Sequence, residues 1–201
     1  MLTDFQRQLR EKYLQTPTTH APEPWERVTD PLISIGGLIG VGFAPHPETR
    51  RDLLLVISSD GRGLFDPATG EKLDRDRDPD WSTPDNPELT CPGIGPLAGT
   101  SIRISGLFGG GLNTTSGDGW TVSVVSPDWP HHRILLSTDG GLNRGPAEVN
   151  WWHIFHADYS ELRAAGFSPS GRTLAVATSS DITLWNRPDV YQPARHFRTH
   201  V

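Results

Sequence analysis

The chain has 201 residues, enough for one domain with a sizeable core, and its length does not require two. Glycine and proline supply 39 residues, 21 and 18 respectively, a share that suits the turns of an all-β protein and lies below that of disordered chains. The formal charge of −6 and the pI near 5.7 argue against nucleic acid or an anionic membrane as the main partner, because both recruit clustered cations.

Cysteine usage and apolar runs bear on the compartment. The single cysteine, Cys91, forms no disulfide within the chain, so no oxidising compartment is indicated. The first residues contain no apolar run of signal-peptide length, and no later stretch approaches the roughly twenty apolar residues of a membrane span. We therefore expect a soluble, cytoplasmic protein.

The first residues predict a short amphipathic helix. Phe5, Leu9 and Tyr13 follow one another at helical spacing, and Thr3 and Gln6 have the spacing of a capping box. Such a helix can act as a lid over an edge or an end of the core. It can also act as a binding element for a partner.

A linker follows the predicted helix. Residues 16–24 are rich in threonine and proline, which predicts an extended segment, and Trp25 is expected to anchor its far end. The chain is therefore divided into residues 1–24, helix and linker, and residues 25–201, a single β domain.

A pattern of strand-forming runs separated by turn residues occupies residues 32–73. One apolar run ends at Phe43, a second covers residues 53–57, a Ser-Ser-Asp bend follows, and a third run ends at Phe65. Residues 164–187 repeat this order. Their corresponding features are Phe167, residues 174–178 and Trp185. Each stretch predicts an antiparallel meander.

The spacing of turn residues extends the pattern. Residues 122–140 contain a third copy that lacks the phenylalanine. The turn prolines Pro45, Pro127 and Pro169 are separated by 82 and 42 residues, and 82 is close to twice 41. A period of this size predicts a fourth, degenerate unit near residue 86.

Other strands are expected outside the matched blocks. Residues 101–108 are strand-like, and residues 149–156 are a candidate outer strand of the third unit. Residues 32–35 and 194–198 are candidates for completing one unit with segments from opposite ends of the chain.

The stretch 164–187, with its F-S-P-x-G turn, Ser/Asp bend and aliphatic-Trp pair, resembles a WD40-type repeat, although Asn186 stands where that family has Asp. In outline the resemblance covers residues 32–188. It implies an all-β, propeller-like array of about four, or five, antiparallel blades that serves as a platform for partner proteins. The alternatives are a sandwich or irregular meander, and an incomplete ring that closes by dimerisation.

Alternating carboxylates after the first unit form a candidate site. Asp74, Asp76, Asp78 and Asp80 have the spacing of early calcium ligands. However, arginines occupy the intervening positions and Pro79 stands where a turn glycine is needed. We expect a solvated, self-paired connection that could face a basic partner.

Histidines and the cysteine do not predict a catalytic or metal site. On a regular strand His153 and His156 point to opposite faces, and the adjacent His131 and His132 lack a nearby third ligand in the sequence. Cys91 precedes no helix N-terminus that could activate it. We therefore predict no catalytic residue, no metal site and no cofactor.

Tryptophans in or beside the expected loops are candidate interface anchors, although packing between units is the alternative for each. They are Trp81, Trp129, Trp151 and Trp152. The full set of candidate partner-binding residues is Asp74, Asp76, Asp78, Asp80, Trp81, Trp129, His131, His132, Trp151 and Trp152.

These features predict a non-enzymatic protein-interaction module, with an inhibitor or immunity protein against a basic partner as one form. The alternative is a small hydrolase or lyase at the axial mouth of a propeller, and a third option is sugar binding through exposed tryptophans. We expect a monomer, or a dimer if the ring is incomplete. Function should be sought in the loops 46–52, 74–81 and 128–132.

Overall fold

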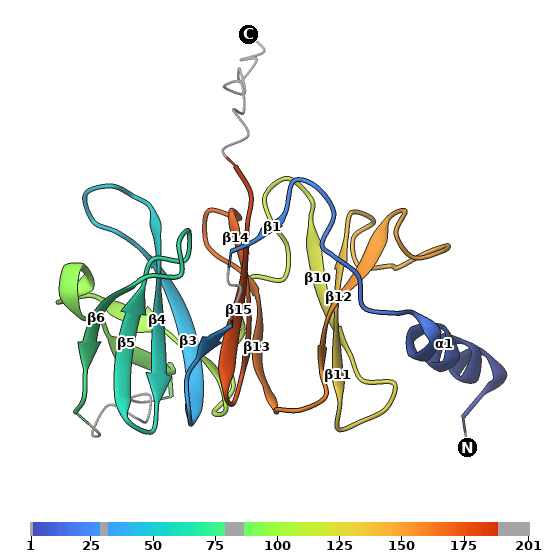
Figure 1. The fold of residues 1–201 in the computed structure, drawn as a ribbon, viewed down its shortest axis with the longest axis horizontal. Helices are drawn as coiled ribbons and strands as arrows, with labels where there is room; N and C mark the ends of the chain where they lie inside the picture. Colours follow the sequence, from blue (N-terminus) through green and yellow to red (C-terminus); the bar gives the residue numbers. More distant parts are fainter. Residues whose placement is uncertain (1, 29–31, 79–86, 189–201) are drawn as a thin grey trace, which may run out of the picture.

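The computed structural model describes residues 2–28, 32–78 and 87–188 (Figure 1). Within these residues the protein is all-β, with one short N-terminal α-helix and four antiparallel sheets. The fold class predicted from the sequence is therefore confirmed. No helix in the described part of the chain is long and apolar enough to cross a membrane.

The strands are distributed over four sheets. The first, in the order β6-β5-β4-β3-β9, contains β3 (Leu38–Pro45), β4 (Asp52–Ser58), β5 (Gly61–Phe65), β6 (Lys72–Asp76) and β9 (Ser105–Gly106). The second is β7 (Thr90–Pro92) with β8 (Ser101–Arg103), beside the 3-10 helix η2 (Gly95–Leu97). The third is β10 (Thr121–Val125), β11 (His132–Ser137) and β12 (Trp151–Ala157). The fourth contains β1 (Glu26–Arg27), β2 (Ile33–Ser34), β13 (Leu162–Phe167), β14 (Thr173–Thr178) and β15 (Asp181–Asn186).

The stretches 32–73 and 164–187 form antiparallel meanders, and the third copy, residues 122–140, forms the antiparallel hairpin of β10 and β11. Their central runs become the middle strands β4, β11 and β14, and the Ser-Ser-Asp bends lie at the ends of β4 and β14. The predicted outer strand of the third unit is β12, which pairs with β11. Turn residues between strand-forming runs thus set the local structure correctly.

The sheets stand face to face in a row (Figure 1). Leu54 and Val56 of β4 pack against the sheet of β13–β15, whereas Leu55 and its neighbours on the other face pack against β7, β8 and η2. Residues of β14 likewise face two neighbours, with Leu174 toward β10–β12 and Ala175 toward β3–β5. Burial on both faces explains why these strands are almost continuously apolar.

The N-terminal segment completes the last sheet of the chain. Glu26 of β1 pairs with Asn186, and Ile33 of β2 pairs with Ile182 on the same strand, β15. The prediction that residues 32–35 complete a unit is confirmed in this form, whereas residues 194–198 lie outside the described residues. These pairs cover an edge that would otherwise expose unpaired backbone groups.

In the region of the expected fourth unit, the described residues form the two-stranded sheet β7–β8. The strand expected over residues 101–108 is divided, because β8 pairs with β7 while β9 pairs with β3. Glycines permit the second pairing: a Cβ built on Gly106 would lie 2.2 Å from the carbonyl oxygen of Ile39. Only a residue without a side chain tolerates that approach.

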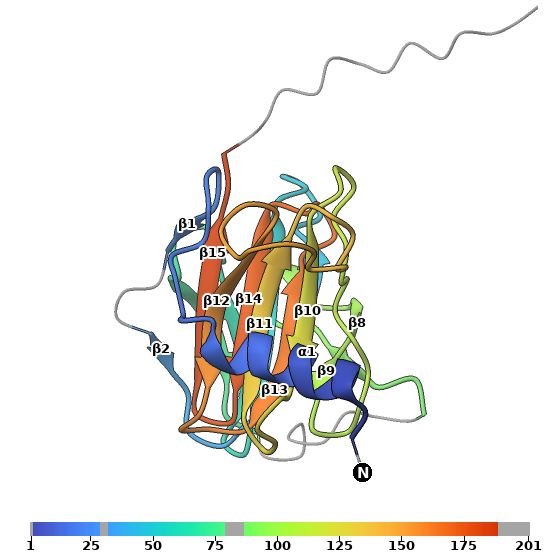
Figure 2. The same cartoon turned by 90° about the vertical axis from the view of Figure 1, so that its right-hand side faces the viewer.

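The helix α1 (Asp4–Gln15) begins with the predicted capping box of Thr3 and Gln6. It lies across the outer face of β10–β12, away from the other sheets (Figures 1 and 2). Its apolar stripe packs only at one end, where the Tyr13 ring meets Trp151 edge-on with centroids 5.9 Å apart. Trp25 is buried at the end of the linker, as predicted.

Candidate functional site

Two imidazoles and a carboxylate meet on the outer face of β10–β12. Asp128 and His131 lie on the loop between β10 and β11, and His156 lies on β12. Their ligating atoms are all within 4.8 Å of one another. His131 Nδ1 is 3.8 Å and His156 Nε2 is 4.0 Å from Asp128 Oδ2. Among the described residues, no other group of three histidine, cysteine or carboxylate side chains is close enough together to hold a metal ion.

A β-bulge positions His156. Strand β12 carries one extra residue, Ile154, because the residues on either side of it pair with the consecutive residues Ile134 and Leu135. The extra residue shifts the alternation of side chains along the strand. His153 and His156 therefore lie on the same face, with ring centroids 5.9 Å apart. The prediction that they point to opposite faces is wrong, since it assumed a regular strand.

A turn brings the other two groups together. The His131 backbone N–H donates to the Asp128 carbonyl oxygen over 3.2 Å, which closes the loop around Trp129 and Pro130. The side chains three residues apart in this turn then face each other. His132 is turned away from the cluster, and its Nδ1 lies 2.8 Å from the Ser126 hydroxyl.

Arg133 keeps Asp128 ionised. Burial alone raises the pKa of the Asp128 carboxyl, but the hydrogen bond and the charge of Arg133 outweigh it, and the pKa lies below its usual value. The contact joins Arg133 Nη2 to Asp128 Oδ2 over 3.3 Å. The Arg133 side chain is only 10% exposed, so it depends on this carboxylate as its counter-charge.

Burial disfavours the charged form of His153 and His156. Burial, followed by the charge of Arg133, lowers the pKa of His156. Burial also lowers the pKa of His153, although its hydrogen bond to the Thr16 carbonyl oxygen opposes the effect. That bond, 3.0 Å long, must be donated by Nδ1–H, which leaves the Nε2 lone pair of His153 free to accept.

Unsatisfied polar atoms concentrate in this cluster. Eight buried side-chain polar atoms among the described residues have no hydrogen-bond partner, and four of them belong to Asp128 (Oδ1), Arg133 (Nε), His153 (Nε2) and His156 (Nε2). Buried polar groups in folded proteins are nearly always partnered, so such a concentration calls for a physical explanation. It separates this cluster from the rest of the molecule.

The predicted tryptophan anchors differ in exposure. Trp129, on the loop between Asp128 and His131, is 79% exposed. Trp151 is buried, and its Nε1–H donates to the Gly145 carbonyl oxygen. Trp152 is half-buried and its ring lies 6.0 Å from that of Trp120. Trp151 and Trp152 are thus packing residues, the alternative considered for each, while Trp81 lies outside the described residues.

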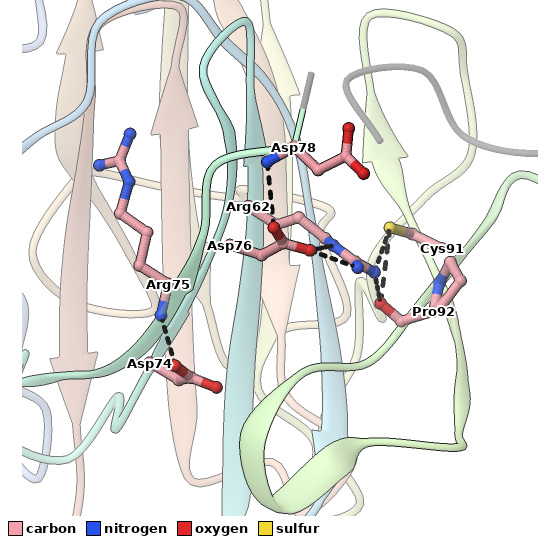
Figure 3. Close-up of polar contacts among 7 residues, drawn as sticks. All are labelled: Arg62, Asp74, Arg75, Asp76, Asp78, Cys91 and Pro92. Atoms are coloured by element: carbon pink, nitrogen blue, oxygen red, sulfur yellow. Dashed lines mark hydrogen bonds and ion pairs between the residues drawn. The ribbon is translucent and has the colours of Figure 1, made fainter. Parts of the chain in front are cut away.

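The acidic run makes local pairs, as Figure 3 shows. Arg62 donates to Asp76 Oδ2 from Nη2 over 2.7 Å and also bonds to the Pro92 carbonyl oxygen, so it ties β6 to β7. Its hydrogen bond lowers the pKa of Asp76. Asp74 accepts from the next backbone N–H, and Asp78 donates its own backbone N–H to Asp76. The self-paired connection expected from the sequence describes this part of the run, and Asp80 lies outside the described residues.

The thiol of Cys91 lies on β7, in a different sheet from the cluster. Cys91 is buried against Arg62, and burial raises the pKa of its thiol. A separate cleft of about 460 Å³ lies between turns of the first and last units, lined by Arg50, Arg51 and Asp66 among others. No histidine lines it.

Comparison of the chain with family models, with curated proteins and with solved structures finds no match. The resemblance of residues 32–188 to WD40-type repeats therefore rests on the sequence motifs. Of the site, sequence reasoning selected the loop 128–132 and the residue His131. It missed Arg133, whose role depends on burial, and the place of His156, because the bulge has no compositional signal.

Proposed function

We propose that the protein is a non-enzymatic, cytoplasmic protein-interaction module, with its sheets forming a propeller-like platform. The observation that carries the proposal is the exposure of Trp129. This residue is 79% exposed to solvent and lies in the turn closed by the hydrogen bond between His131 and Asp128. An exposed tryptophan is costly to leave in water, and tryptophan is the residue most favoured as an anchor of protein interfaces.

The N-terminal helix extends this surface. Arg10 Nε donates to the Pro127 carbonyl oxygen over 2.5 Å, which ties α1 to the loop of Trp129. Phe5 is 71% and Leu9 37% exposed, although both belong to the apolar stripe that ends at Tyr13. We call Phe5, Leu9 and Trp129 the apolar binding surface.

The partner that suits this surface is a protein with an apolar site and a basic rim. The net charge of −6 favours encounter with a basic protein through long-range attraction. The acidic run is a weaker candidate for the contact itself, because Asp76 is already neutralised by Arg62. An inhibitor or immunity protein against a basic toxin or nuclease fits this description.

The test is affinity capture from native lysate followed by calorimetry with the captured protein. Trp129→Ala should weaken binding by about 2 kcal/mol, roughly thirtyfold. Phe108→Ala, which removes another half-exposed aromatic ring, is the matched control and should bind like the parent protein. Absence of any partner, or equal loss in both variants, would contradict the proposal.

A hydrolase or lyase at an axial mouth has less support. That function needs histidines and carboxylates from several units to converge. The convergent groups, Asp128, His131 and His156, come from one unit and lie on the outer face of its sheet. The cleft of about 460 Å³ beside Arg50 has no histidine in its lining, so it does not supply the combination that this function needs.

A further inference from the structure

The side chains of the outer face of β10–β12 are suited to a cation. Asp128 offers a carboxylate oxygen, and His131 and His156 each offer an imidazole nitrogen. Two imidazoles with one carboxylate form a common ligand set for zinc, with the fourth position left to water or another ligand. We propose that Asp128, His131 and His156 bind one divalent transition-metal ion, Zn²⁺ being the expected ion.

The separations agree with this role. Bonds from zinc to nitrogen and oxygen are about 2.0–2.2 Å, so ligand atoms lie roughly 3–4 Å apart around the ion. The two histidine nitrogens are 3.8 and 4.0 Å from Asp128 Oδ2. A small movement of the His131 side chain closes the site, since this side chain lies on a loop and, at 45%, is the most exposed of the three.

Buried groups around the ligands point independently to a bound ion. His153 is 1% exposed, with its Nε2 unpartnered, and it stands next to His156 in the same face. Arg133 is 8% exposed and its Nε is also unpartnered. A polar cluster of this kind is not satisfied by the protein alone.

The local charge favours a cation over an anion. With the imidazoles counted as neutral, Asp128 and the charged side chains that contact the ligand set, Asp158 and Arg133, together carry one negative charge. Arg133 contacts Asp128 through Oδ2, the oxygen that lies 3.8 and 4.0 Å from the two histidine nitrogens, and Oδ1 has no partner. A carboxylate can serve both cations because each oxygen carries two lone pairs.

Asp158 supplies an outer contact. Its Oδ2 lies 3.7 Å from His156 Nδ1, on the side of the ring opposite the nitrogen that faces Asp128. Carboxylates in this position fix the orientation of metal-binding histidines and raise their basicity. Nitrogen ligands together with a single carboxylate disfavour Ca²⁺ and Mg²⁺, which take mainly oxygen ligands.

The experiment uses the full chain without any affinity tag. Zn²⁺ is titrated in competition with a chromogenic chelator, and Co²⁺ is added separately so that its visible absorption reports coordination by the protein. The parent protein should bind one equivalent. Asp128→Asn, His131→Ala and His156→Ala should each lose more than the roughly 10- to 100-fold that loss of an outer-shell partner costs, and Asp158→Asn should fall within that range.

His132→Ala is the matched control, because His132 is adjacent in sequence but bonds to Ser126 outside the cluster. It should retain the affinity of the parent protein. Circular dichroism verifies that each variant is folded. If His156→Ala misfolds, His131→Ala still tests the site, because His131 is half-exposed on a loop and its loss should not disturb the fold. Absence of stoichiometric binding by the parent, unchanged affinity in the ligand variants, or equal loss in His132→Ala would each overturn the proposal.

Discussion

At the scale of single residues, the ion pair of Arg187 and Asp118 fixes the chain just after β15. Arg187 follows β15, and its Nη2 donates to Asp118 Oδ1 over 2.7 Å. The guanidinium also lies over the ring of Trp25, 4.9 Å from the centroid. Hydrogen bonding to Arg187 lowers the pKa of Asp118 from 3.8 to about 2. The contact therefore joins the loop before β10 to the core of the domain.

The lowered pKa gives the pair a defined pH dependence. Its contribution to stability is present above the unfolded-state value of 3.8 and is lost as the pH falls toward 2. Because Asp118 is about one-third exposed, solvent screening reduces the contribution to about 1 kcal/mol. Asp118→Asn should lower the free energy of unfolding by this amount at pH 7, and in urea titrations the difference from the parent should shrink as the pH falls through about 2 and be lost below it. An equal effect of Glu71→Gln, at an exposed carboxylate, would show that the pair is not responsible.

At the scale of elements, α1 is held through its C-terminal half, where Arg10, Lys12 and Tyr13 make its contacts with the domain. Tyr13 meets Trp151, and Lys12 Nζ lies 4.7 Å from the centroid of the same indole. Toward the other end, Phe5 extends into solvent. Short helices are marginal in water, so contacts at the Tyr13 end and the cap at Thr3 keep this one folded.

Alanine substitutions at the two ends of the apolar stripe of α1 should have different effects on stability. Tyr13→Ala should lower the free energy of unfolding by about 1–2 kcal/mol, because it removes the edge-on contact with Trp151. Phe5→Ala should change it by no more than about 0.5 kcal/mol. Chemical denaturation of both variants checks this, and an equal cost at both positions would contradict the description of the helix.

The elements also show how far sequence can predict this protein. Runs such as 53–57 and 174–178, set off by turn residues, predicted the middle strands because both faces of those strands are buried. The extra residue Ile154 could not be foreseen, since a bulge depends on the pairing with Ile134 and Leu135. For the same reason His156 could not be assigned to the face of Arg133. The exposure of a tryptophan such as Trp151 depends on what α1 covers, which no local pattern encodes.

At the scale of the whole molecule, the N-terminal segment is part of the domain. Trp25 is 3% exposed and packs against Phe167, with ring centroids 5.4 Å apart, in the core between the last two sheets. Trp25→Ala should therefore cost about 3–5 kcal/mol of unfolding free energy. Trp129→Ala, at the exposed tryptophan, should cost no more than about 0.5 kcal/mol in the same assay. A small effect at Trp25 would mean that the linker only rests on the surface.

The position of β1 and β2 has a consequence for synthesis on the ribosome. These strands are synthesised before the other described strands, yet their partner, β15, is the last described strand to be made. In the sheet of β3–β6, Leu54 and Val56 likewise stay uncovered until β14 and β15 have been synthesised. Pairings between such distant segments are slow to form, and the waiting strands expose apolar surface in the meantime. We expect the nascent chain to depend on holding chaperones until its last unit emerges.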